Sequence, residues 1–97
     1  MSRNDNQSTL GDAIKLLLKN YQLDQKYAEY KAIHSWEENM GPLIARHTKK
    51  LYIKDNKLFI HVDSAALRHE LSMAKEKIMK LINDEAGVNL VNEVILR

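Results

Sequence analysis

The spacing of apolar residues changes twice along this 97-residue chain, and the change limits the folds it can form. Up to about residue 46, apolar side chains recur every three or four residues, which is typical of helices with one buried face. Between residues 47 and 62 they alternate with polar ones, which is typical of strands. Helical spacing returns after residue 63. A chain of this length forms one domain, so the pattern predicts a single α+β domain.

Two helices are expected before the strands. Residues 1–8 are polar and lack periodicity, so they are expected to form a disordered leader, with the domain spanning residues 9–97. The first helix begins at Thr9, which can cap it, and ends at Asn20 and Tyr21. Its apolar face is expected to pack on the edge or face of the sheet. The members of that face are Leu10, Ile14, Leu17 and Leu18.

The second helix is expected to run from Asp24 to about Asn39. Gly41 and Pro42 close it, because glycine accepts the left-handed position after a helix and proline cannot continue the hydrogen-bond ladder. Residues 43–46 are compatible with one further turn.

Residues 47–62 predict an antiparallel hairpin with an aliphatic inner face. Asp55 and Asn56 tolerate the positive φ that a tight turn requires, so they are expected to join the two strands. Alternation places the remaining side chains on an outer face. These are Tyr52, Lys54, Phe59 and His61.

A long helix is expected from Asp63 or Ser64 to about Glu85, with Gly87 ending it. Residues 88–96 are rich in Val, Ile and Leu, which predicts a third strand. The complete expected order is α-α-β-β-α-β, with the strands backed by the long helix.

The residue content excludes several functional classes. The chain has no cysteine, which excludes disulfides and thiolate chemistry and agrees with a reducing compartment. The longest apolar run, at residues 16–18, is far too short to cross a membrane. The N-terminus lacks the apolar centre of a signal peptide. A cytoplasmic protein without membrane contact is therefore expected.

No arrangement of residues predicts an active site, a metal site or a cofactor. The four histidines show no pair four residues apart on a predicted helix, so the metalloprotease spacing is missing. They are His34, His47, His61 and His69. Acids that are adjacent in sequence, such as Glu37 and Glu38, point in different directions on a helix and cannot flank one substrate bond. We therefore expect a non-enzymatic binding protein with no small-molecule substrate.

The net charge of +2 is small, but its distribution is uneven. Residues 43–57 hold five cations and one anion, Asp55, and so form a candidate nucleic-acid-binding segment. Cations on phosphates release counterions, a threonine hydroxyl can add a phosphate contact, and Tyr52 and Phe59 can stack on unpaired bases. The candidate binding residues are Arg46, His47, Thr48, Lys49, Lys50, Lys54 and Lys57.

Each of these features also has a structural interpretation. The lysines can simply protect a sheet edge from aggregation, and the two aromatic residues can pack under the N-terminal helices. Trp36, at helical spacing from Ile33, is typical of a core residue, but tryptophan is also enriched where proteins bind each other. Trp36, Tyr52 and Phe59 are accordingly the candidate partner-binding residues.

The order of these motifs resembles that of the DciA family. The resemblance lies in Trp36, Gly41, the segment Ile44-Ala45-Arg46-His47-Thr48, the join Leu58-Phe59-Ile60-His61-Val62-Asp63-Ser64-Ala65, and Leu71. It covers the chain from about residue 10 to residue 96. It implies a KH-like fold and a bacterial DNA-replication role as loader or operator of the DnaB-type replicative helicase, with single-stranded or branched DNA as a further partner.

The chain departs from a true KH domain in one respect. It has no G-x-x-G loop, the element with which KH domains clamp a nucleic-acid backbone. Two alternatives therefore stay open beside the helicase adaptor. One is a KH-like module that binds RNA or single-stranded DNA without a helicase, and the other is a protein-protein module that dimerises through the hairpin edge or Trp36.

Overall fold

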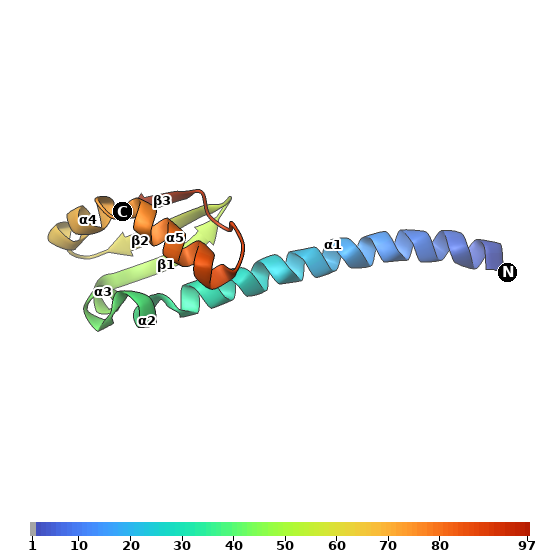
Figure 1. Ribbon diagram of the computed structural model, residues 1–97, viewed down its shortest axis with the longest axis horizontal. Coiled ribbons are helices and arrows are strands. Elements are labelled where there is room, and N and C mark those ends of the chain that lie inside the picture. Colours follow the sequence, from blue (N-terminus) through green and yellow to red (C-terminus); the bar gives the residue numbers. More distant parts are fainter. Residues whose placement is uncertain (1) are drawn as a thin grey trace.

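A long helix projects from a small sheet-and-helix domain in the computed structural model, which describes the backbone of residues 2–97 and the side chains from residue 9 onward (Figure 1). The molecule measures 67 × 20 × 20 Å. The elements, in chain order, are α1 (Ser2–His34), α2 (Trp36–Met40), α3 (Pro42–His47), β1 (Thr48–Lys54), β2 (Lys57–Val62), α4 (Ala65–Ser72), α5 (Lys75–Ala86) and β3 (Glu93–Leu96). The α+β class is confirmed.

The sheet has the order β1-β2-β3, with β2 in the centre. β1 and β2 form the predicted antiparallel hairpin, and β3 runs parallel to β2. Asp55 and Asn56 join the hairpin with φ of 53° and 61°, the positive values that a two-residue turn needs. The turn was therefore predicted correctly, and it sets the register in which Tyr52 lies opposite Phe59.

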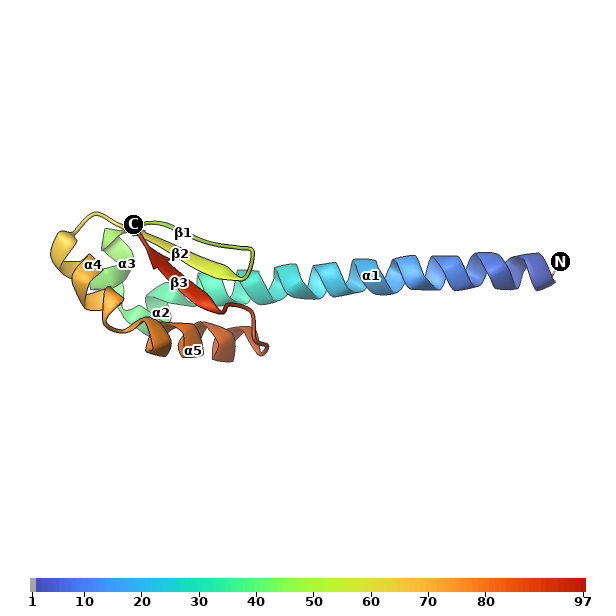
Figure 2. The same ribbon diagram turned by 90° about the horizontal axis from the view of Figure 1, so that it is seen from above.

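The core lies between the inner face of the sheet and the helices. Leu58 and Ile60 of β2 are fully buried, and they pack with Trp36 and with Ile82 of α5. Figure 2 shows α2 and α5 on one side of the sheet. The helices that bury apolar residues against the sheet use this inner side, so no described helix covers the other side.

The N-terminal helices differ from the prediction. One continuous helix, α1, replaces the first expected helix and most of the second, and the expected ends at Asn20 and Tyr21 are wrong. The expected continuation to about Asn39 is also wrong, because α1 ends at His34 and a turn at Ser35 separates it from α2. Residues 20–24 contain neither proline nor glycine, and asparagine lowers helix stability by only a few tenths of a kcal/mol or so, which does not end a helix. The disordered leader expected at residues 1–8 falls where side chains lie outside the described part, and it stays a prediction.

The expectation that the apolar face of the N-terminal helix packs on the sheet is also wrong. Leu10, Ile14 and Leu17 are 65%, 51% and 68% exposed. Only the last turns of α1 reach the domain, where Ala28 and Ala32 are buried against the core. The helix is straight and long, so its first half extends beyond every other element (Figure 1).

The single long helix expected after the hairpin is interrupted. α4 ends at Ser72 and α5 begins at Lys75, and the residues between them form tighter bonds three residues apart, Met73 N to Glu70 O and Ala74 N to Leu71 O. Ser64 caps α4, since its Oγ accepts a hydrogen bond from Leu67 N at 3.2 Å. The break lets α4 and α5 take different directions over the sheet (Figure 1).

The third strand is shorter than expected and begins at Glu93 rather than at residue 88. Leu90 and Val91 are buried, but their backbone forms hydrogen bonds with the Asn83 side chain of α5 and not with a neighbouring strand. Asn83 Oδ1 accepts hydrogen bonds from both N–H groups at 2.9 Å, and its Nδ2 donates to Val91 O at 3.0 Å. This asparagine therefore takes the place that strand pairing was expected to fill.

Candidate nucleic-acid interface

The outer face of the sheet is the candidate binding surface. No described helix covers it, and Figure 2 shows the helices on the other side. We define the outer face by the side chains that alternate away from the buried positions of β1, β2 and β3, together with Arg97, which extends the pairing of β3 with β2 through its bonds to Ile60 and Val62. These side chains are Lys50, Tyr52, Lys54, Lys57, Phe59, His61, Glu93, Ile95 and Arg97.

Aromatic rings occupy the middle of the outer face. Tyr52 and Phe59 stack across the hairpin with ring centroids 4.8 Å apart and an interplanar angle of 12°. His61 lies 5.7 Å from Tyr52, and the Arg97 guanidinium lies 5.5 Å from the centroid of Phe59. Tyr52 remains 38% exposed, so the row keeps an accessible aromatic surface. The predicted outer position of Tyr52, Phe59 and His61 is confirmed.

Cations border the aromatic row. Lys54 lies directly opposite Lys57 in the hairpin register, and Lys50 lies opposite His61. Like charges in opposite positions repel, and an anion bound between them would remove that cost. Within the described part of the chain, none of these three lysines forms an ion pair. Glu93 of β3 lies beside Lys57 in the parallel register and is the one acid on the described outer face, which therefore keeps a positive net charge.

Two of the predicted cationic residues are held elsewhere. Asp63 Oδ1 lies 2.7 Å from His47 Nδ1, and Asp63 Oδ2 lies 3.2 Å from Lys49 Nζ. A register shift between Thr48 and Lys50 leaves Lys49 as an extra residue in β1, which turns it away from the ladder. The hydrogen bonds from His47 and then Lys49 lower the pKa of Asp63 below its usual value, because both stabilise the carboxylate. Asp63 therefore neutralises this end of the basic segment.

Trp36 and Thr48 form a second internal contact. Trp36 is only 4% exposed, and its Nε1 donates a hydrogen bond of 3.1 Å to Thr48 Oγ1. The Thr48 hydroxyl in turn donates to Ile44 O at 2.7 Å. Burial leaves Trp36 without the exposed surface that a partner-binding role requires, and its place agrees with the core interpretation. Thr48 is likewise engaged in joining α2, α3 and β1.

The predicted set of seven binding residues therefore divides. Lys50, Lys54 and Lys57 share the outer face. His47 and Lys49 contact Asp63, and Thr48 contacts Trp36. Arg46 is exposed in the last turn of α3.

Sequence reasoning missed Asp63 and Arg97 as members of the site. Asp63 was considered only as a helix cap, and its acidic side chain two residues after His61 gave no sign of a contact with His47. Arg97 follows the last strand, so only the parallel pairing of β3 brings it beside Phe59.

Other kinds of site find no support in the described residues. No group of three or more histidine, aspartate or glutamate side chains is arranged to hold a metal ion there. Among the described helices, none is both long enough and apolar enough to cross a membrane.

The chain is thus a small α+β domain whose open sheet face combines aromatic rings with lysines that form no ion pair among the described residues. The family model of the Dna[CI] antecedent, DciA, matches residues 9–96. The chain belongs to the DciA family, as the motif order indicated.

One curated relative also resembles this chain. A UPF0232 protein of Corynebacterium glutamicum (strain R) is 42% identical over 60 residues, which is 62% of this chain and 34% of that protein. The chain thus spans about a third of the length of this relative. The activity and partners of the whole relative are therefore a separate question from the domain shared here.

Proposed function

We propose that this chain is a non-enzymatic adaptor that helps to load or operate a DnaB-type replicative helicase and contacts single-stranded DNA through the outer face. Membership of the DciA family supports the helicase part. Its mechanism is one of binding: the adaptor biases the placement or opening of the helicase ring, and ATP hydrolysis is left to the helicase.

The observation that carries the DNA part is the pair of opposed lysines, Lys54 and Lys57, neither of which forms an ion pair with a described residue, beside the stacked Tyr52 and Phe59. Two opposed lysines form a place for a phosphate, and an adjacent aromatic row offers a place for an unpaired base. Duplex DNA presents no free base faces, so this combination favours single strands. Few cations take part, so the affinity is expected to be weak and sensitive to salt.

The experiment for the DNA part is fluorescence polarisation with labelled single-stranded DNA, duplex DNA and single-stranded RNA across a salt series. Neutralising about three phosphates predicts a slope of log affinity against log salt of roughly −2. Lys54→Glu should weaken single-strand binding by about tenfold and flatten this slope. Lys77→Glu, an exposed lysine on α5, is the matched control and should bind as the unaltered chain does.

The results separate the alternatives. Single-strand binding that does not change with salt, or that Lys54→Glu and Lys77→Glu weaken equally, contradicts the outer face as the DNA site. Equal affinity for RNA and DNA, without a helicase complex, favours the KH-like nucleic-acid module instead.

The helicase part is tested by size-exclusion chromatography with the replicative helicase from the same organism. A co-eluting complex at micromolar concentration is expected, both for the unaltered chain and for Lys54→Glu. The absence of a complex at this concentration contradicts the adaptor role and leaves the DNA proposal standing by itself.

A further inference from the structure

The first half of α1 carries an apolar stripe that no described residue covers. We name it the α1 seam and define it by Leu10, Ile14, Leu17 and Tyr21. Their side chains are 65%, 51%, 68% and 63% exposed. The spacing of four, three and four residues is that of the two core positions in a coiled-coil heptad. This row is thus arranged as one side of a helix-helix contact.

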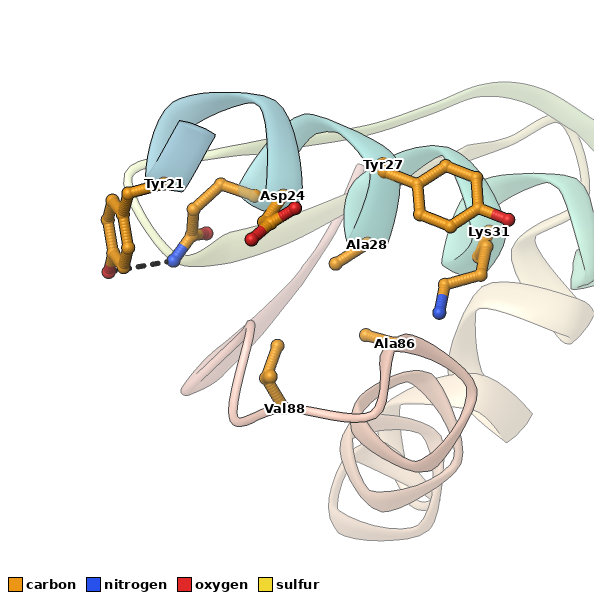
Figure 3. Close-up of a pocket in the computed structure, with 8 residues that line it drawn as sticks. Tyr21, Asp24, Tyr27, Ala28, Lys31, Ala86 and Val88 are labelled. Carbon is orange, nitrogen blue, oxygen red and sulfur yellow. Dashed lines mark hydrogen bonds between the residues drawn. The ribbon is translucent and has the colours of Figure 1, made fainter. Parts of the chain in front are cut away.

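The α1 seam continues a contact that already exists in the fold. Ala28 lies seven residues after Tyr21 and therefore on the same face of the helix, and it is buried against α5 at 6% exposure. A groove of about 390 Å³ separates α1 from the end of α5. Tyr21 and Ala28 line it on the α1 side, and Ala86 and Val88 line it on the other side (Figure 3). One face of α1 is therefore covered by α5 at its end and bare along its first half.

A bare helix of this kind gains little stability by itself. Most helical stability in proteins comes from packing of the apolar face, and an isolated helix of about 15 residues is marginal in water. Four large apolar side chains in one row also exceed the scattered exposure that is normal on a surface. A second helix on the α1 seam would bury them.

The flanks of the α1 seam favour an identical chain as that second helix. The positions beside it are Gly11, Ala13, Leu18 and Asn20, all of them uncharged. In paired helices, opposite charges at these flanking positions favour a particular partner, and like charges there disfavour pairing between identical chains. Uncharged flanks let two copies approach without repulsion and offer no charge pattern to a different partner. The small Gly11 and Ala13 also permit close approach.

The direction of the pairing follows from the position of α5. In a parallel pair, the two α5 helices would meet between the two α1 helices at Ala28, because α5 lies on the same face as the α1 seam. In an antiparallel pair, Leu10 of one copy lies opposite Tyr21 of the other, and Ile14 lies opposite Leu17. The two domains then sit at opposite ends, and the partner helix, which begins at Ser2, reaches the groove beside Ala28.

We propose that the α1 seam is the contact surface between two copies of this chain, paired antiparallel about a twofold axis between Ile14 and Leu17. Each contact between two seam residues then occurs twice in the dimer, as twofold symmetry requires. The seam spans about 17 Å, or less than two full heptads, so the dimer is expected to dissociate in the micromolar range. This inference does not depend on the proposed function.

The first test measures mass by light scattering and by sedimentation equilibrium over a concentration series. The unaltered chain should pass from monomer to dimer. Leu17→Glu places a charge in the centre of the seam and should weaken the dimer at least about tenfold. Leu16→Glu is the matched control, because Leu16 is 58% exposed and adjacent in sequence but points away from the seam. At concentrations well below the dissociation constant of the dimer, both variants should melt as the unaltered chain does, since pairing stabilises only the dimer.

The second test determines whether the two helices pair parallel or antiparallel. The sequence contains no cysteine, so an introduced cysteine can form a disulfide only with another introduced cysteine. An equimolar mixture of Leu10→Cys and Tyr21→Cys chains should form a mixed disulfide under mild oxidation, because these positions face each other in the antiparallel pair. Leu10→Cys alone should form none, since its two copies lie roughly 16 Å apart along the axis. Cross-linking of Leu10→Cys with itself overturns the antiparallel arrangement.

Two further outcomes overturn the proposal. One is a monomer at all concentrations up to high micromolar. The other is a dimer that Leu17→Glu and Leu16→Glu weaken equally, because that result places the contact elsewhere. A monomeric chain that loses binding to the replicative helicase only in Leu17→Glu would assign the α1 seam to that different partner.

Discussion

His47 and Asp63 are joined by a contact of 2.7 Å between Nδ1 and Oδ1, which fixes the start of β1 to the residue that follows β2. The backbone repeats the connection, since Asp63 N donates to His47 O at 3.1 Å. Lys49 adds its ammonium group to the same carboxylate at 3.2 Å. One acid therefore closes the open end of the hairpin and reduces the charge of the basic segment.

Asp63→Asn is expected to strengthen single-strand binding. The change removes a negative charge and frees Lys49, which precedes Lys50 of the outer face in β1. A unit charge a few ångströms away contributes about 1 kcal/mol in water, so the affinity should rise by about fivefold at low salt. Polarisation with labelled single-stranded DNA measures it. Asp84→Asn, which removes the partner of Lys80 on α5, is the control and should change nothing. Unchanged affinity in Asp63→Asn would place the DNA away from this end of the hairpin.

The Asp63 contact should also make stability depend on pH. Its pKa is lowered in the folded chain from the ordinary value of 3.8, so the carboxylate stabilises the fold above that value. The stabilisation is lost as the pH falls through the lowered pKa. The melting temperature of the unaltered chain should therefore exceed that of Asp63→Asn at neutral pH, and the two should converge in acid below 3.8. A difference that persists there would show that Asp63 acts through its neutral hydrogen bonds.

The role of Trp36 is expected to be structural. Trp36→Phe keeps most of the buried ring but removes the donor to Thr48, which should lower the free energy of unfolding by about 1 kcal/mol. Trp36→Ala should lower it by about 3–5 kcal/mol through loss of packing. Urea unfolding measures both.

The matching change Thr48→Val tests whether the two side chains act together. Because they share one hydrogen bond, the double variant with Trp36→Phe should cost less than the sum of the single changes. Strictly additive losses in the free energy of unfolding would contradict an energetic coupling between the two side chains. DNA affinity of the folded Trp36→Phe variant should stay unchanged, since Trp36 lies on the inner side of the sheet.

The hairpin could be predicted from sequence because alternation and turn chemistry are local. Strands of period two, with Asp55 and Asn56 between them, leave one register that buries Leu58 and Ile60. The outer face follows from the same alternation. Local patterns could not predict the position of Lys49 or the exposure of Leu17. Lys49 leaves the outer face through a one-residue irregularity in pairing, and an apolar row such as the α1 seam has the same spacing whether the fold covers it or not.

The connection between α5 and β3 was equally beyond local reasoning. Residues 88–96 have the composition of a strand, yet pairing is impossible for part of them because Asn83 already satisfies their backbone. An asparagine on a helix gives no signal in the sequence that it will bind a segment seven residues later. Only the packed structure brings them together.

Asn83→Ala is therefore expected to be the most destabilising change of any polar residue in α5. It leaves the N–H group of Val91 without an acceptor, while that of Leu90 keeps only its bond to Val88 O at 2.9 Å, and Leu90 and Val91 are only 2% and 3% exposed. An unsatisfied buried donor costs about 1–3 kcal/mol, so the free energy of unfolding should fall by about that amount.

Two comparisons make this prediction sharp. Asn89 lies at an exposed position in the same connection. Asn89→Ala should therefore lower the free energy of unfolding by less than about 0.5 kcal/mol. Asn83→Asp keeps the oxygen that accepts from both N–H groups but loses the donor to Val91 O, so its stability should lie between those of the unaltered chain and Asn83→Ala. Urea unfolding gives all three values. Equal loss in Asn83→Ala and Asn89→Ala would mean that apolar packing of Leu90 and Val91, rather than the asparagine, holds β3 in its parallel place beside β2.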